Sequence, residues 1–562
     1  MIAGAGGSIM RATMKSGAAA MGRRTPLGGQ SEETASIQMA KHRRIPVIDV
    51  FAGPGGLGEG FAALRHKRRS PFRVALSIEK DEAAHATLWL RAFYRLFTAR
   101  TVPESYYDVL RRDISLDELR ARHPRKAKAA DADAWRAELG YGGVDQKEVR
   151  KRIRSAVGGM RAWVLVGGPP CQAYSIAGRS RNKGNLNYSA EKDVRQKLYV
   201  EYLQVLADHW PPVFVMENVK GLLSATVGDQ RIFSRMLEDL QSPADALKRE
   251  GRRGRSRRCH RYRVHSLVRG GLFESDLPDF VIQAELYGIP QTRHRLILLG
   301  VRNDLGDIAP GKLETTGPVP ASLVLRNLPR LRSGLSRTKD SPEAWAEGVR
   351  SALRTRWFAE VGEKAGGQEV LERMHAVLKS LSPFPFDRGD EFLPYEASPD
   401  YSKDWFTDPR FEGICNHVTR QHMLSDLHRY LYVACFGEVR SHSPRLRDFP
   451  PSLLPDHKNV PRAVDTRHFS DRFRVQIYGA PSTTITCHIA KDGHYFIHPD
   501  PEQCRSLTVR EAARLQCFPD NYCFLGPRTS QYRQVGNAVP PLLSRQIAEI
   551  VHGVLVEAGM AD

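Results

Sequence analysis

The sequence has few cysteines and no long apolar run. Its eight cysteines are spread irregularly over 562 residues, unlike the dense cysteines of a small disulfide-stabilised domain. Its apolar runs stay far below the roughly 20 residues that a membrane-spanning helix needs, and no apolar core follows a charged start as in a secretory signal. We therefore expect a protein of the reducing cytoplasm that makes no contact with a membrane.

Acidic residues are scarce relative to basic ones. The chain has 84 Lys and Arg against 63 Asp and Glu, a formal net charge of +21 at pH 7. Because surplus cations are attracted to polyanions, this charge predicts a partner such as nucleic acid, although a basic protein without such a partner would have the same composition. Hydrophobic residues make up 41% of the chain, which is enough for a folded core.

An alternating pattern of strands and helices begins after a glycine-rich start. Residues 1–44 are rich in Gly, Ala and Ser without an apolar period, so we expect a disordered tail. From Ile45 onward, short apolar runs such as IPVIDV, RVALSI, WVLV and VFVM alternate with helical patterns. Runs of this kind, bounded by Gly or Pro, are typical of strands buried on both faces. The pattern predicts an α/β fold with a doubly wound, mostly parallel sheet.

The alternation stops near residue 304. Residues 305–470 are rich in Pro, Gly, Ser and Arg and hold isolated helical segments, which indicates a smaller inserted lobe. Two further helical patterns follow it, so we expect a first domain over 45–304 that resumes over 471–562. The stretch 248–269 holds ten basic residues and one acidic residue. It is expected to be a solvated loop, with phosphate contact as the alternative.

A glycine-rich segment follows the first predicted strand. It reads DVFAGPGGLGEG from Asp49, and its glycines would let the backbone approach a nucleotide-like ligand at the carboxyl edge of the sheet. Glu79 ends the next predicted strand, the usual place for a carboxylate that accepts hydrogen bonds from ribose hydroxyls. The glycine spacing differs from the dinucleotide pattern and favours an adenosine-bearing ligand over NAD. A nicotinamide-dependent oxidoreductase is kept as an alternative.

Three more motifs lie at the ends of predicted strands. Cys171 follows WVLV within GGPPCQ, where flanking prolines favour a reactive position over a buried structural one. Glu217 ends VFVM and could either donate a proton or form a structural hydrogen bond. In QTRHR, alternation along an extended chain puts Gln291, Arg293 and Arg295 on one side. Two guanidinium groups could hold anionic or carbonyl oxygens there.

In this order, the motifs resemble those of the cytosine-C5 DNA methyltransferase family. The resemblance covers most of residues 45–301 and about 475–552, through DVFAGPGGLGEGF, GGPPCQAYS, ENV, QTRHR, LTVREAARLQCFPD and QVGNAVPP. It implies an S-adenosylmethionine-dependent methyltransferase fold whose inserted lobe recognises the target, and methyl transfer to carbon 5 of a cytosine flipped out of double-stranded DNA. It also implies no metal and a nucleoid-associated location. A restriction–modification or phage-defence setting is expected, with a cognate restriction endonuclease or defence-system proteins as candidate partners.

The resemblance also implies roles for individual residues. The Cys171 thiolate would attack carbon 6 of the cytosine while Glu217 protonates or hydrogen-bonds N3. Arg295, supported by Arg293, would bind the cytosine carbonyl and a neighbouring phosphate, and Asn218 would shape the nucleophile loop. Residues from several motifs would contact the cofactor: Phe51, Gly53, Gly55, Gly56, Leu57, Glu79, Asp113, Ile114, Pro170, Leu198, Asn537 and Ala538. Within this set Glu79 would bind the ribose, and Asp113 with Ile114 would bind the adenine edge, after a poorly defined strand over 105–112.

Other interpretations stay open at this point. An RNA cytosine methyltransferase of the same family is one, against which the long lobe and the lack of a Cys-Phe-Thr tripeptide argue. A catalytically inactive DNA-binding relative is another, against which the intact motifs argue. The cysteines and histidines at 415, 417, 422 and 435 lack a convincing zinc spacing, so we expect a polar cluster there. Residues 484–508 predict an extra hairpin that turns at 491–493.

Overall fold

The computed structural model describes residues 44–170, 197–227, 230–254, 260–268, 280–396, 398–456, 460 and 470–562. The chain divides into two compact units, residues 1–43 and 44–562. The second unit contains all of the described residues, so the tail expected over 1–44 lies outside them apart from Arg44. Within the described residues, no helix combines the length and apolar character needed to cross a membrane.

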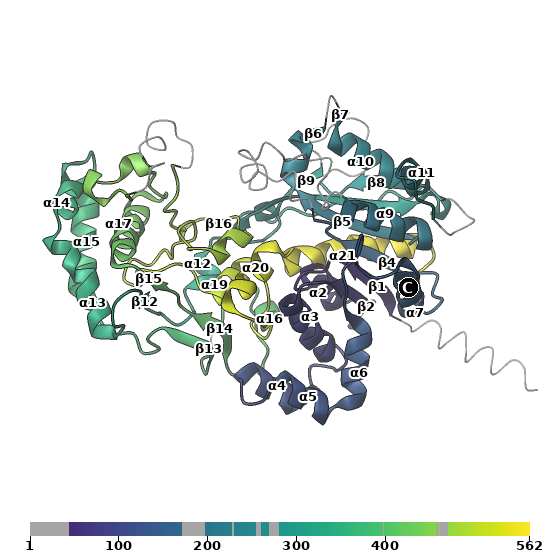
Figure 1. Ribbon diagram of the computed structural model, residues 1–562, viewed down its shortest axis with the longest axis horizontal. Helices are drawn as coiled ribbons and strands as arrows, with labels where there is room; N and C mark the ends of the chain where they lie inside the picture. Colours follow the sequence, from purple (N-terminus) through teal and green to yellow (C-terminus); the bar gives the residue numbers. More distant parts are fainter. Residues whose placement is uncertain are drawn as a thin grey trace, which may run out of the picture. The chain divides into compact units, whose positions relative to one another are not determined.

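The second unit contains a mixed sheet of eight strands in the order β3-β2-β1-β4-β5-β11-β8, with β9 beside β11 (Figure 1). The strands are β1 (Ile45–Val50), β2 (Phe72–Glu79), β3 (Ala134–Arg136), β4 (Val164–Gly167), β5 (Val213–Val219), β8 (Tyr262–Ser266), β9 (Val281–Gln283) and β11 (His294–Arg302). The first five strands in that order are parallel, whereas β11 is antiparallel to β5, β8 and β9. The predicted α/β class and mostly parallel sheet are confirmed.

Successive residues of each central strand point to opposite faces and enter two different apolar cores. In β4, Val164 and Val166 belong to one core and Leu165 to the other. In β11, Ile297 and Leu299 likewise alternate with Leu298. Both faces are therefore covered, which explains why these strands are continuous apolar runs rather than alternating ones.

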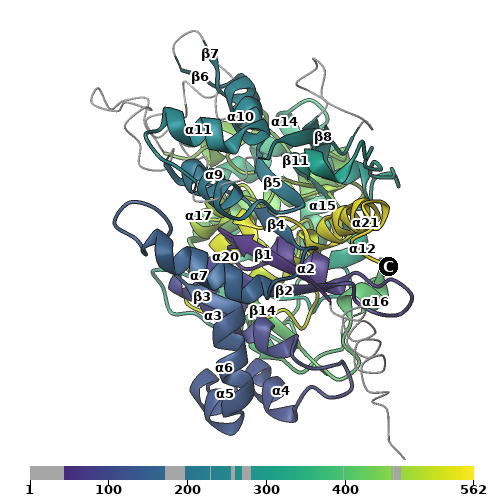
Figure 2. The same cartoon turned by 90° about the vertical axis from the view of Figure 1, so that its right-hand side faces the viewer.

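Helices from distant parts of the chain cover the two faces (Figure 2). One core contains residues of α2 (Gly56–Ala63), α19 (Val509–Leu515), α20 (Arg528–Asn537) and α21 (Pro541–Glu557). The other contains residues of α7 (Gln146–Val157), α9 (Lys197–His209), α10 (Ile232–Gln241) and α11 (Pro243–Arg249). The C-terminal segment reaches the glycine-rich helix directly, since Ser544 Oγ donates to Leu57 O at 2.7 Å.

A separate core belongs to the lobe drawn on the left of Figure 1. It joins α13 (Pro342–Arg350), α14 (Arg356–Glu363), α15 (Gly367–Ser380) and α17 (Leu424–Arg440) with later residues as far as Cys504. Residues between Ile308 and Leu328 instead pack in the core beneath the sheet, around α12 (Ser322–Leu325). The core of the lobe thus begins and ends later in the chain than the expected limits of 305 and 470.

A third group of helices supports the edge of the sheet at β2 and β3. It consists of α3 (Glu82–Tyr94), α4 (Glu104–Arg111), α5 (Leu116–Arg122) and α6 (Pro124–Asp133). Its core also includes Phe411, which precedes β14 (Ile414–Val418), and Cys415, which lies in β14. This strand pairs antiparallel with β13 (Gly389–Leu393). The strand expected over 105–112 is wrong, because this segment is the amphipathic helix α4, whose buried Tyr106, Tyr107 and Leu110 share one face.

The hairpin expected within residues 484–508 does not turn at 491–493. Cys487–Ala490 form the 3₁₀ helix η9, and Ser482–Thr483 form β16, which pairs with β10 (Gln291–Thr292). The antiparallel bridge of this region joins Ile497 to Ser506 instead. Arg420 donates to Lys491 O at 2.8 Å. The segment thus pairs with itself over 496–507, with its turn between His498 and Arg505, and its earlier part is held by neighbouring elements.

Candidate active site

A partly buried ion pair joins two predicted catalytic residues at the edge of the sheet. Glu217 on β5 and Arg295 on β11 come together because the two strands are antiparallel neighbours. Arg295 Nε lies 3.0 Å from Glu217 Oε1, and the side chains are 15% and 13% exposed. Burial lowers the pKa of Arg295, and the Glu217 carboxylate opposes this shift. The site thus holds a carboxylate and a guanidinium in contact, both with a small accessible surface.

The same carboxylate lies against the loop that leads to the predicted nucleophile. A Cβ atom at Gly168 would lie 2.9 Å from Glu217 Oε2, so only glycine fits there without displacing the carboxylate. Asn218 donates to Pro169 O at 3.5 Å and accepts from Val219 N at 2.8 Å, in agreement with its expected contact with the loop. Cys171 lies outside the described residues, which end at Pro170 on this side of the loop.

Arg293 has different partners from Arg295, although the two are separated by one residue. Its guanidinium donates to Ile485 O at 2.7 Å, to Ala538 O at 2.8 Å and to Gly536 O at 3.2 Å. Arg293 is 1% exposed, and burial, followed by the charge of Arg295, lowers its pKa well below the ordinary value. Arg293 thus ties the QTRHR segment to the C-terminal motif.

The glycine-rich loop and Glu79 form a second cluster, at the ends of β1 and β2. Gly53 N donates to Glu79 Oε2 at 2.9 Å, while the backbone N–H groups of Lys80 and Asp81 donate to Oε1. Burial raises the pKa of Glu79, and these three hydrogen bonds oppose that shift. Gly53 and Gly55 have φ angles of 57° and 95°, so the turn uses backbone conformations that favour glycine. The carboxylate is thereby fixed beside a loop with open space at Gly53.

The remaining predicted cofactor residues surround this loop. Leu57 is buried in α2, and Phe51, which has a positive φ of 57°, directly precedes the loop. Gly56 meets the C-terminal motif, because its Cβ would lie 2.2 Å from Val539 O. Asn537 is exposed at the end of α20, and the carbonyls of its two neighbours, Gly536 and Ala538, are those that Arg293 binds. Leu198 lies in α9, across from the turn after β3.

Asp113 and Ile114 do not follow a strand. They come after α4, where Asp113 is 61% exposed and lies 3.2 Å from Arg111 Nε. The third strand is β3, in which Arg136 lies opposite Glu79 in the parallel register. The residue after β3 also contacts β2, because Ala137 N donates to Glu79 O at 3.0 Å. The expected position of Asp113 and Ile114 after a strand is therefore wrong, and the residues that β3 brings beside Glu79 are Arg136 and Ala137. The short AWR run and the glycines after it were the sequence signal for this strand.

One buried acid was not among the residues singled out from the sequence. Asp49 on β1 is fully buried beneath the loop, with Oδ2 only 3.1 Å from the position of a Cβ at Gly58. Burial raises its pKa to about 7, opposed by the Gly58 backbone and Arg95 and reinforced by Glu79. Its place inside the DVFAG motif was a signal, because a strand buried on both faces gives a carboxylate no access to water.

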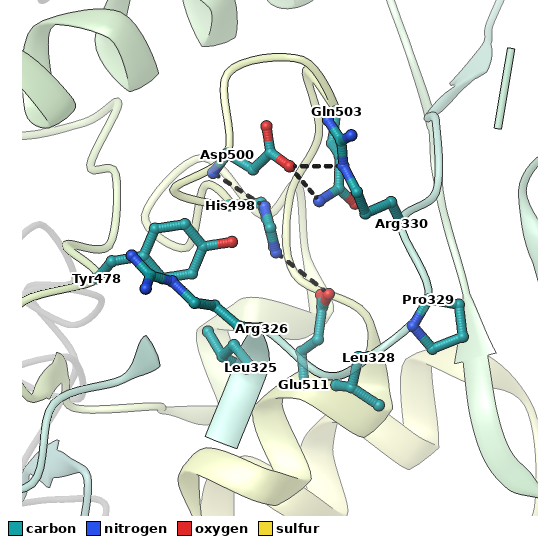
Figure 3. A pocket seen from close by; sticks show the side chains of 10 residues that line it. All are labelled: Leu325, Arg326, Leu328, Pro329, Arg330, Tyr478, His498, Asp500, Gln503 and Glu511. Carbon is teal, nitrogen blue, oxygen red and sulfur yellow. Dashed lines mark hydrogen bonds and ion pairs between the residues drawn. The ribbon is translucent and has the colours of Figure 1, made fainter. Parts of the chain in front are cut away.

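A cavity of about 290 Å³ lies elsewhere, between α12, α19 and the lobe (Figure 3). Arg330 Nε lies 3.0 Å from Asp500 Oδ2, and His498 Nε2 lies 3.4 Å from Glu511 Oε1. Burial lowers the pKa of His498 to about 4. These two pairs account for its charged lining apart from Arg326, which lies 4.9 Å from the centre of the Tyr478 ring, and none of the predicted site residues lines the cavity. We assign this cavity to the junction of the lobe with the sheet domain.

The polar cluster expected around 415–435 is formed partly by histidines with protein partners. His417 Nδ1 lies 2.9 Å from Thr508 Oγ1, and its Nε2 lies 2.9 Å from Pro329 O. His422 instead contacts Ser506 and Tyr430. In the part of the chain that the structure describes, no group of three or more His, Cys, Asp or Glu side chains is arranged to hold a metal ion.

Comparison with known proteins places the chain in a family. The family model described as C-5 cytosine-specific DNA methylase matches residues 138–243 and 279–552. The type II methyltransferase M.Bpa9945I of Bacillus paralicheniformis is 31% identical over 531 residues, which cover 91% of this chain and 99% of that protein. The DNA (cytosine-5-)-methyltransferase M.ApeKI of Aeropyrum pernix is 28% identical over 446 residues, which cover 75% of this chain and 88% of its own. The chain belongs to the C-5 cytosine-specific DNA methylase family and is a DNA (cytosine-5-)-methyltransferase.

Proposed function

We propose that the enzyme methylates carbon 5 of a flipped-out cytosine in a specific duplex sequence, through a covalent bond between Cys171 and carbon 6. The observation that carries this proposal is the Glu217–Arg295 pair, held against the loop that leads to Cys171. An acid, a cation and a cysteine loop at one edge of the sheet are the groups that activation of a pyrimidine ring requires.

The residues divide the reaction between them. The Cys171 thiolate adds to carbon 6 while Glu217 donates a proton or a hydrogen bond to N3, so that the electron pair of the ring becomes available at carbon 5. Arg295 binds the cytosine carbonyl through guanidinium N–H groups that do not contact Glu217. After methylation, loss of the proton on carbon 5 restores the double bond and expels the Cys171 thiolate. The base must leave the duplex to reach these groups, at a cost of a few kcal/mol.

The glycine-rich loop and its surroundings fit S-adenosylmethionine. Glu79 keeps acceptor capacity for ribose hydroxyls because a carboxylate has about four acceptor sites and three are used. Gly53, Gly55, Gly56, Leu57 and Phe51 would line the nucleoside and amino-acid portions, with Pro170, Leu198, Asn537 and Ala538 around them. Bound there, S-adenosylmethionine supplies the methyl group.

We assign the adenine edge to Glu138 and Leu139 in place of Asp113 and Ile114. These two residues follow Arg136 and Ala137, which lie beside Glu79. A Cβ at the next residue, Gly140, would lie 3.3 Å from Leu198 Cδ2, so the turn after β3 meets another predicted cofactor contact. The Glu138 carboxylate can accept from an exocyclic amine, and the Leu139 N–H can donate to a ring nitrogen.

The relatives indicate a biological setting. Because M.Bpa9945I and M.AgeI of Thalassovita gelatinovora bear the name type II methyltransferase, we propose that this enzyme protects DNA in a restriction–modification or phage-defence system of the cytoplasm. Its partners would then be double-stranded DNA and a cognate restriction endonuclease or defence-system protein. The separate core of the lobe, from Leu335 to Cys504, would support the surface that recognises the target sequence.

Two measurements test the proposal. Bisulfite sequencing of DNA from cells that express the enzyme should show 5-methylcytosine at one recurring sequence. Duplex DNA that contains 5-fluorocytosine at that site, with S-adenosylmethionine present, should then form a denaturation-resistant adduct that maps to Cys171. The Cys171→Ala variant should form no adduct and no product while still binding the methyl donor. Methylation by this variant would refute the covalent route, and methylation of transfer RNA in place of duplex DNA would favour the RNA alternative.

A further inference from the structure

A strongly basic hollow lies on α7, outside the site described above. Its volume is about 280 Å³, and its lining consists of Lys147, Arg150, Lys151 and Arg154. These residues are three, four and seven positions apart, so they share one face of the helix. The opposite face is apolar, with Val149 and Ile153 buried against the sheet. The helix therefore has a fixed orientation, and its basic face points away from the core.

Little acidic charge balances this face. Arg150 lies 3.3 Å from the buried Asp208 of α9. Lys151 is 81% exposed and has only a loose ion pair of 3.7 Å with Glu148. Among the described residues, no ion pair involves Lys147 or Arg154. Four cations at one hollow repel each other, and this arrangement is typical of a surface that binds an anion.

A second basic segment meets the start of α7. Glu201 on α9 is 1% exposed and binds both the Gln146 side chain and Arg252, the latter at 2.8 Å. Arg252 belongs to the basic stretch that follows α11. The α7 face and this stretch are thus joined at Glu201, and Figure 2 shows α7, α9 and α11 along the same side of the unit.

The hollow is close enough to the catalytic edge to reach the same DNA molecule. α7 connects the carboxyl end of β3 to β4 and so begins at the edge of the sheet that carries Glu79 and Glu217. It contacts β1 and β2, which are two and three strands from β5. At about 4.8 Å per strand this is a lateral offset of about 10–15 Å. A duplex seated at the catalytic edge spans that distance within a few base pairs, since its rise is about 3.4 Å.

We propose that the α7 hollow binds backbone phosphates of duplex DNA that flanks the target sequence. This inference rests on the proposed function, because it takes the same DNA as substrate. The hollow makes no base contact, so it adds affinity for any flanking sequence and adds no sequence specificity. Part of the basic surplus of the chain then has a function in binding DNA.

The test compares duplexes of two lengths. One duplex ends a few base pairs from the target cytosine, and the other extends about 15 base pairs beyond it on each side. The double variant Lys147→Gln/Lys151→Gln removes two charges and leaves the Arg150–Asp208 ion pair in place. The control is Arg125→Gln/Lys128→Gln, which removes two exposed charges from α6. Binding is measured by fluorescence anisotropy over a range of salt concentrations.

The α7 variant should bind the long duplex several-fold more weakly than the wild type does. Its plot of log affinity against log salt should be shallower by about 0.9 for each phosphate that the variant no longer neutralises. For the α7 variant, the affinity for the short duplex and the kcat on that duplex should equal the wild-type values. The control variant should bind both duplexes as the wild type does. Equal losses on both duplexes, no loss on the long one, or the same loss in the control would each overturn the inference. Anisotropy does not depend on methylation, so wild-type turnover in a parallel assay reports separately on the proposed function.

Discussion

The proposed cofactor half and the proposed substrate half of the site are assembled in different ways. In the cofactor half, Gly53 donates to Glu79, 26 residues along the chain. In the substrate half, Arg293 binds carbonyl groups 192 to 245 residues away. The Gly53–Glu79 contact is thus a product of one β-α-β unit, whereas the contacts of Arg293 exist only after the C-terminal segment has returned to the sheet. Loss of the Glu79 side chain should therefore act on ligand binding, whereas loss of the Arg293 side chain should also act on folding.

The two arginines of the substrate half sharpen this contrast. Arg295 pairs with a carboxylate and retains 15% exposure, so it can still meet the base. Arg293 binds only carbonyl oxygens of the chain and is 1% exposed. One motif therefore supplies a proposed substrate contact, Arg295, and a positioning residue, Arg293, which binds the carbonyl groups on both sides of Asn537.

Replacement of Glu217 should have the largest effect. Glu217→Gln keeps the size of the side chain and a hydrogen bond to Arg295, but an amide cannot transfer the proton to N3. We expect kcat to fall by about 10²–10⁴-fold, the usual contribution of a positioned proton donor. Steady-state methylation of duplex DNA measures this, with calorimetric binding of S-adenosylmethionine as the control. A variant that loses cofactor binding as well would contradict the separation of the two halves.

Arg293→Met should destabilise the protein rather than act on substrate alone. It removes a charged donor from three carbonyl groups in a buried setting, and we expect the free energy of unfolding to fall by about 3–5 kcal/mol. Urea unfolding followed by tryptophan fluorescence measures the loss, with the exposed Arg125→Met as the matched control. If Arg293→Met were as stable as the control and only KM for DNA rose, Arg293 would be a substrate ligand and the comparison would fail.

The cofactor half should show a pH dependence that originates at Asp49. Burial raises its pKa from 3.8 to about 7, so between these values the folded protein keeps a proton that the unfolded chain releases. The contribution of this group to stability is complete below about pH 4 and is lost as pH rises through 7. The urea midpoint of Asp49→Asn should therefore rise relative to wild type between pH 5 and pH 8. A constant difference across this range would show that Asp49 is ionised in the fold.

Much of this comparison was predictable from local sequence. The apolar runs of β1, β2, β4, β5 and β11 predicted the sheet because each is buried on both faces, and the motif ends predicted where Glu79, Glu217 and Arg295 would lie. The partners of Arg293 were not predictable, because no local pattern records which carbonyl groups the C-terminal segment presents to it. The segment 105–112 misled because its tyrosines and valine favour a strand, whereas its burial pattern fits the amphipathic helix α4.

The smallest expected effect concerns the adenine edge, whose residues were misassigned because a strand was expected over 105–112. If β3 places Glu138 at the adenine edge, Glu138→Gln weakens one hydrogen bond to an exocyclic amine. KM for S-adenosylmethionine should rise about 3–10-fold with kcat unchanged, as the loss of one hydrogen bond of about 1 kcal/mol implies. Asp113→Asn is the matched control and should leave KM unchanged, because Asp113 is exposed and paired with Arg111. If KM rose for Asp113→Asn alone, the adenine edge would lie at Asp113, as the sequence motif indicated. The register of β3 beside β2 would then have no part in cofactor binding.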